Sequence, residues 1–120
     1  MVNALKIAKM DEEKRKEEMS KIFQKILKDK EEKQLKTLVE MTTDMKKATD
    51  EEYINLCLTN MSIASTLDDT QLKGFMALRM KANSELPDDI KSRDMQMIND
   101  AMGKLPEDTR NKLSAAMPKN

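Results

Sequence analysis

The chain has 120 residues, enough for one domain, and its 22 basic and 22 acidic side chains give no net charge. Charged residues make up 37% of it, yet the balanced charge and twelve methionines favour a folded domain over a disordered one. The lack of histidine argues against the commonest acid–base catalysis, and the even charge argues against a strongly basic arm for nucleic acid.

Targeting and membrane signals are weak throughout the sequence. No apolar run approaches the roughly 20 residues that cross a bilayer, and residues 1–10 lack the features of a secretory signal. The single cysteine, Cys57, has no partner for an internal disulfide, which fits a reducing compartment. We therefore expect a cytoplasmic protein with no membrane association.

The first predicted helical region, residues 2–27, has an apolar face only in its second half. Residues 11–18, DEEKRKEE, have no apolar face, so we expect a solvated helix there, supported by Glu–Lys neighbours three and four apart. Val2, Leu5 and Ala8 precede this polar stretch. They are expected to be frayed or docked elsewhere.

A second helix is predicted to begin at residues 29–32, DKEE. Asp29 would be its N-cap, and Glu32 would bond back to the N–H of that cap to complete a capping box. Because no glycine or proline interrupts residues 11–47, one long helix through Asp29 is the alternative.

Four later helix starts are clearer. Residues 49–52, TDEE, and 68–71, DDTQ, both read as capping boxes. Pro87 and Pro106 are expected at the first helical position of the last two helices, where their missing N–H is tolerated. Gly103 is expected to lie just after the end of the helix that precedes Pro106.

Acidic residues at these starts recur every 19 residues: Glu12, Glu31, Asp50, Asp69, Asp88 and Glu107. From residue 48 onward an apolar residue also recurs before each start, whereas the earlier members fit coincidence. The spacing predicts an all-α fold, a small bundle or solenoid-like array of five to six short helices. We expect one domain, with residues 1–48 as a charged helix or helix pair that can protrude and residues 49–118 as a compact four-helix unit.

No motif predicts catalysis, a cofactor or a metal site. Cys57 falls on an expected core face with no histidine to activate it, so we expect a buried, inert thiol. The acidic pairs at 68–69, 88–89 and 107–108 lack the alternating ligands and central glycine of a calcium loop, and helix capping explains them. We therefore predict a protein that is not an enzyme.

Methionine is unusually frequent in this chain, with 12 among 120 residues. Its flexible side chain adapts to varied partners, so we predict a methionine-rich apolar groove that binds another protein and includes Phe75, Met76 and Met80. Thioethers also suit copper(I), which is a further alternative. The methionine pairs that suggest it are Met41 and Met45, Met76 and Met80, and Met95 and Met97. Filling of a core that has few aromatic residues explains the same methionines.

Nucleic acid and a second copy of the chain are the alternative partners. The lysines of residues 6–36 suggest a small nucleic-acid-associated or transcription-related regulator. Nucleic acid is the less favoured partner, because glutamates interleave with these lysines and no aromatic residue is placed to stack on a base. Residues 11–47 could instead pair with a second copy as a homodimer, although their apolar seam is short. The preferred hypothesis is a cytoplasmic, non-catalytic helical module that binds another protein.

Overall fold

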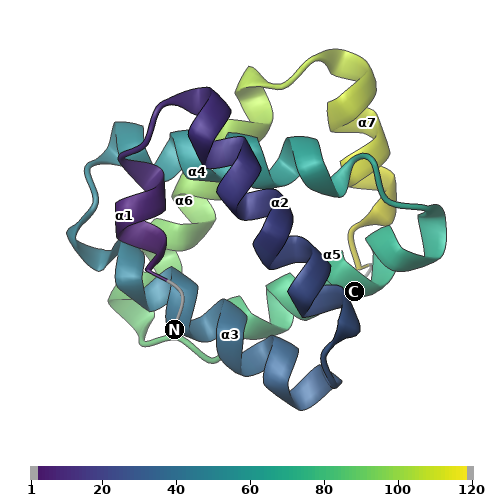
Figure 1. Ribbon diagram of the computed structural model, residues 1–120, viewed down its shortest axis with the longest axis horizontal. Coiled ribbons are helices and arrows are strands. Elements are labelled where there is room, and N and C mark those ends of the chain that lie inside the picture. The colour runs from purple at the N-terminus through teal and green to yellow at the C-terminus, as the bar shows by residue number, and fades with distance from the viewer. Residues whose placement is uncertain (1–2, 119–120) are drawn as a thin grey trace.

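The computed structural model describes residues 3–118, which form helices and no strand (Figure 1). The helices are α1 (Ala4–Ala8), α2 (Glu12–Lys28), α3 (Glu31–Asp44), the 3-10 turn η1 (Met45–Lys47), α4 (Asp50–Ala64), α5 (Asp69–Ser84), α6 (Asp88–Lys104) and α7 (Glu107–Ala116). The all-α prediction is confirmed, but this part of the chain has seven α-helices rather than five or six, since the short α1 was not expected. None of these helices is both long enough and apolar enough to cross a membrane.

Each acidic residue of the 19-residue series is the first residue of a helix, from α2 through α7. The spacing therefore holds in the N-terminal part of the chain, where coincidence was the alternative. An acidic side chain is favoured at this position because the backbone N–H groups give the start of a helix a partial positive charge.

The helix is interrupted between α2 and α3, so residues 11–47 do not form one helix. The capping box predicted at this break is wrong. Asp29 follows the end of α2 and its N–H donates to the carbonyl of Ile26 at 3.0 Å, whereas Lys30 precedes α3 without a side-chain cap. The side-chain amide of Gln34 donates to the same Ile26 carbonyl, so α3 itself helps to close the end of α2.

The capping box at the start of α4 is confirmed. Thr49 Oγ1 accepts from the N–H of Glu52 at 3.1 Å, and Glu52 Oε1 accepts from the N–H of Thr49 at 2.9 Å. At the start of α5, Asp68 accepts from the N–H of Gln71 at 2.8 Å, without the reciprocal bond of a full box.

The predicted roles of the prolines and of Gly103 need correction. Pro87 and Pro106 lie one position before the first helical residue, and their carbonyls accept the first helical hydrogen bonds, from Lys91 and Arg110. Gly103 lies inside the last turn of α6 and does not adopt a positive φ. The helix passes through this glycine because nothing there requires a left-handed residue.

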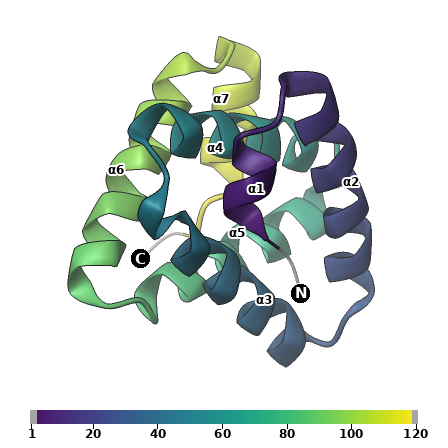
Figure 2. The same cartoon turned by 60° about the vertical axis from the view of Figure 1, so that its left-hand side comes forward.

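The N-terminal helices pack against the later ones rather than extending from them (Figure 2). α1 contacts α2, α3 and α4, and its Ala4 and Ala8 are buried. The N–H of Ala4 donates to Asp44 Oδ2 at 3.4 Å, and Leu5 is partly buried, whereas Val2 lies outside the described residues. One core therefore spans both of the predicted parts of the chain.

The polar start of α2 is helical as expected, but one of its charged side chains is buried. Arg15 is only 8% exposed, and its Nε donates to Thr59 Oγ1 on α4 at 2.8 Å. Its Nη1 donates to the carbonyl of Met10 at 2.8 Å. These bonds satisfy the buried guanidinium and join α2 to α4.

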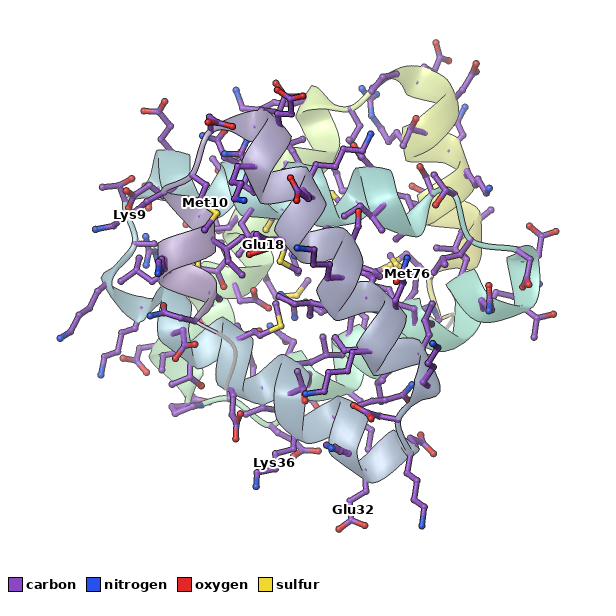
Figure 3. The ribbon with its side chains drawn as sticks, in the orientation of Figure 1. Lys9, Met10, Glu18, Glu32, Lys36 and Met76 are labelled. Carbon is purple, nitrogen blue, oxygen red and sulfur yellow. The ribbon has the colours of Figure 1, made fainter. Side chains whose placement is uncertain are left out.

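From α2 onward, each helix packs against the one two places further along the chain: α2 with α4, α3 with α5, α4 with α6, and α5 with α7. Charged side chains such as Lys9, Glu32 and Lys36 extend outward, whereas Met76 lies in the interior (Figure 3). The alternating pairs bring the apolar faces of six helices to one interior region.

Candidate functional site

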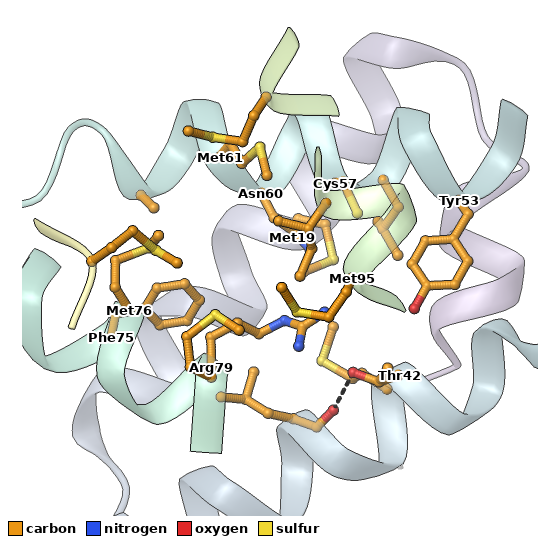
Figure 4. Close-up of a pocket in the computed structure, with 18 of the residues that line it drawn as sticks. Met19, Thr42, Tyr53, Cys57, Asn60, Met61, Phe75, Met76, Arg79 and Met95 are labelled. Carbon is orange, nitrogen blue, oxygen red and sulfur yellow. Dashed lines mark hydrogen bonds between the residues drawn. The ribbon is translucent and has the colours of Figure 1, made fainter. Parts of the chain in front are cut away.

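A partly enclosed cavity of about 450 Å³ lies among the helices, and each of the helices α2 to α7 contributes to its wall (Figure 4). Methionine is the commonest lining residue. The methionines that line the cavity are Met19, Met41, Met45, Met61, Met76, Met80, Met95, Met102 and Met117. The volume falls within the range of about 300–1,000 Å³ that is typical of sites for small ligands.

The helical period explains how these side chains meet. Residues three, four or seven apart share one face of a helix, so an apolar stripe on each helix faces the interior. On α4 the stripe comprises Tyr53, Leu56, Cys57, Asn60, Met61 and Ala64. On α5 it comprises Phe75, Met76, Arg79 and Met80, and on α6 Met95, Ile98, Asn99 and Met102.

The three residues predicted to form an apolar groove, Phe75, Met76 and Met80, all line this cavity. Phe75 packs against Phe23 of α2, with ring centroids 4.9 Å apart and ring planes tilted by 41°. The structure thus brings the predicted residues together. That they bind another protein stays a prediction.

Of the methionine pairs that suggested copper(I), all but Met97 line the cavity, and Met97 is buried elsewhere in the core. Among residues 3–118, no cluster of three or more cysteine, aspartate and glutamate side chains is placed to hold a metal ion. Copper(I) binding through the thioethers stays a prediction.

The lysines that suggested a nucleic-acid partner are partly engaged with acidic neighbours. Lys21 pairs with Glu17 at 3.7 Å and with Glu18 at 3.2 Å, and Lys33 lies 4.0 Å from Asp29. Nucleic-acid binding and a homodimer through residues 11–47 both stay predictions.

The guanidinium of Arg79 extends into the cavity from α5 (Figure 4). Its Nη1 donates to Asp94 Oδ2 at 2.9 Å, and its Nη2 donates to Asp94 Oδ1 at 2.6 Å. The side chain of Asp94 is 0% exposed, whereas that of Arg79 keeps 19% exposure. This two-bond arrangement is the strong form of an arginine–carboxylate pair.

Two more side chains complete the surroundings of Asp94. Tyr53 Oη donates to Oδ1 at 2.5 Å, and Asn83 Nδ2 donates to Oδ2 at 2.8 Å. Asp94 of α6 therefore accepts four hydrogen bonds from α4 and α5, which fixes these three helices around one side of the cavity.

These contacts set the protonation of the cluster. Burial alone would raise the pKa of Asp94, but the charge of Arg79 and the hydrogen bonds hold that pKa below its usual range. Burial alone would lower the pKa of Arg79, but the charge of Asp94 outweighs the effect of burial and raises that pKa. Burial and Asp94 together raise the pKa of Tyr53 far above its usual range. The pair is therefore fully ionised and the phenol neutral at neutral pH.

Sequence reasoning missed this cluster. In the sequence, Asp94 is one of 22 acidic side chains, a residue type that usually faces solvent. One signal was present, because Asp94 precedes Met97 by three residues and Ala101 by seven, and both of these are buried on the same face of α6.

The cavity wall also contains Arg110, Asn60 and Cys57. Arg110 donates from Nε to the carbonyl of Met102 at 3.0 Å and from Nη2 to that of Leu105 at 2.9 Å. The Oδ1 atom of Asn60 is shielded from solvent and accepts no hydrogen bond from residues 3–118. Cys57 is buried as expected, and burial raises the pKa of its thiol to about 12. None of these side chains forms a pair of nucleophile and base.

Comparison of the chain with protein families, with curated proteins and with solved structures finds no match. Its function is therefore inferred from the geometry and chemistry of the cavity.

Proposed function

We propose that this protein is a non-catalytic binding module whose cavity takes up a small apolar molecule. The observation that carries the proposal is the methionine-lined cavity of about 450 Å³ between α2 and α7. Its wall is mainly apolar and it is open to water at Asn99 and Ser114, which are exposed, so an apolar guest would gain free energy by displacing water from the methionine side chains.

The volume also limits what can enter. A cavity of about 150 Å³ holds benzene, so one of about 450 Å³ holds a guest of about 18 heavy atoms. A helix about 10 Å across would fill the same volume within about one turn. This favours a small molecule over a helix of the protein partner that the sequence analysis predicted.

The methionine lining supports a guest of flexible shape. Methionine is unbranched and polarisable, so its side chains can settle around molecules of different outline without leaving large voids. We infer that the apolar part of the guest is selected by size more than by exact shape.

Uptake of the fluorescent apolar probe 1-aminoanthracene tests this function. We expect saturable binding at one site per chain, because the probe is smaller than the limit of about 18 heavy atoms. Ala64→Leu adds bulk to the cavity wall and should weaken binding about fivefold or more. Ala115→Leu makes the same change at an exposed position of α7 and should leave binding unchanged. Failure of the wild-type protein to take up the probe, or equal effects of the two substitutions, would overturn the proposal.

A further inference from the structure

The guanidinium of Arg79 has hydrogen-bond donors to spare inside the cavity. Arginine carries five N–H groups, and Asp94 accepts from two of them. Among residues 3–118, no other side chain or carbonyl accepts from Arg79. Since the side chain is 19% exposed and extends into the cavity, its remaining donors are open to a guest (Figure 4).

The charge at this point is already balanced. Asp94 is fully buried beside Arg79, so a guest carboxylate would bring a second negative charge into a desolvated site. A guest ammonium would meet the positive charge of Arg79. A neutral hydroxyl or carbonyl oxygen accepts a hydrogen bond without either cost.

Arg110 is the other charged residue of the lining and does not offer an open anion site. Its guanidinium donates hydrogen bonds to the carbonyl oxygens of Met102 and Leu105, at the end of α6. The partial negative charge of this helix end offsets the charge of the guanidinium and would repel a carboxylate. Within residues 3–118, no aspartate or glutamate lines the cavity.

Building on the function proposed above, we infer that the guest is an uncharged long-chain amphiphile, such as a primary alcohol or an ester. Its oxygen accepts a hydrogen bond from Arg79, and its hydrocarbon chain lies among the methionines. The cavity then discriminates by head group, while chain length is limited by the volume of about 450 Å³.

The test is displacement of 1-aminoanthracene by 1-decanol, decane, decanoate and decylamine at a mildly alkaline pH, where decanoate is ionised. We expect decanol to bind about tenfold or more tightly than decanoate and decylamine, which share its chain. Arg79→Lys keeps a cation beside Asp94 but removes the guanidinium donors. It should lower the ratio of decanol to decane affinity about three- to tenfold.

Two further variants make the result decisive. Arg79→Met combined with Asp94→Leu replaces the ion pair by apolar side chains, and it should remove the part of the preference for decanol over decane that the Arg79 hydrogen bond provides. Arg110→Lys changes the other guanidinium and should leave that preference intact. Decanoate binding as tightly as decanol, or an unchanged decanol-to-decane ratio in Arg79→Lys, would overturn the inference about the head group alone. If no member of the series displaces the probe, the proposed function itself fails.

Discussion

Replacing Asp94 with alanine would leave the guanidinium of Arg79 buried without its anion. Removing one partner of a buried pair costs about 3–5 kcal/mol. Tyr53 and Asn83 would also lose their acceptor, at about 1 kcal/mol each. The expected loss of stability is about 5–7 kcal/mol. At about 0.05–0.15 kcal/mol per residue, 120 residues give a free energy of unfolding of about 6–18 kcal/mol, so the loss is a large part of the total.

Urea unfolding followed by the circular dichroism of the helices measures this loss. Asp100→Ala, at an exposed position of the same helix, is the matched control and should change the free energy of unfolding by less than about 0.5 kcal/mol. Arg79→Met combined with Asp94→Leu should recover most of the stability, because an apolar pair replaces the ion pair without leaving a lone charge. An Asp94→Ala protein within about 1 kcal/mol of the wild type would refute this account of the cluster.

The same cluster predicts a dependence on pH. The pKa of Asp94 is lower in the folded protein than in an unfolded chain, so its contribution is present above the ordinary aspartate value, about 3.9. That contribution is lost as the pH falls through the folded pKa. The stability of the wild type relative to the double Arg79→Met, Asp94→Leu variant should therefore decrease as the pH is lowered below about 4.

Three simpler predictions follow from local geometry. Thr49→Ala removes half of the capping box with Glu52 and should lower the free energy of unfolding by about 1 kcal/mol, and an unchanged urea midpoint would contradict this role. Gly103→Ala should raise the same free energy by about 0.5–1 kcal/mol, because a Cβ there meets nothing within 4 Å, and a loss of stability would show that the helix end needs glycine. Cys57 lines the cavity, but burial raises the pKa of its thiol to about 12, so it should react with a thiol reagent much more slowly in the native protein than after denaturation. Equally fast reaction in both states would contradict a thiol that is kept protonated.

Helix starts were predictable from the sequence because the chemistry that sets them is local. Thr49 and Glu52 bond to each other across three residues, and the acidic first residues of α2 to α7 act on N–H groups within the same turn. The five residues of α1 were harder to predict, since so short a helix is stable only where it docks, here through Ala4 and Ala8.

The cavity and its polar cluster were not predictable in the same way. Their contacts join residues far apart in the chain, such as Phe23 with Phe75 and Tyr53 with Asp94. A charged residue on a helix usually faces water, so only the helix pairing reveals which one is buried. Methionines at helical spacing indicated apolar faces, but not that six such faces meet around one space.

The central claim, that this cavity holds a guest, is tested most directly by the methyl NMR signals of isotope-labelled methionine in the wild-type protein. Saturating 1-decanol should shift the signals of the nine methionines that line the cavity. Two methionines outside the cavity wall, the buried Met97 and the partly buried Met10 of the α1–α2 turn, should give signals that stay nearly unchanged. Lining signals that do not move at saturation, or shifts that are largest at Met10, would contradict the account.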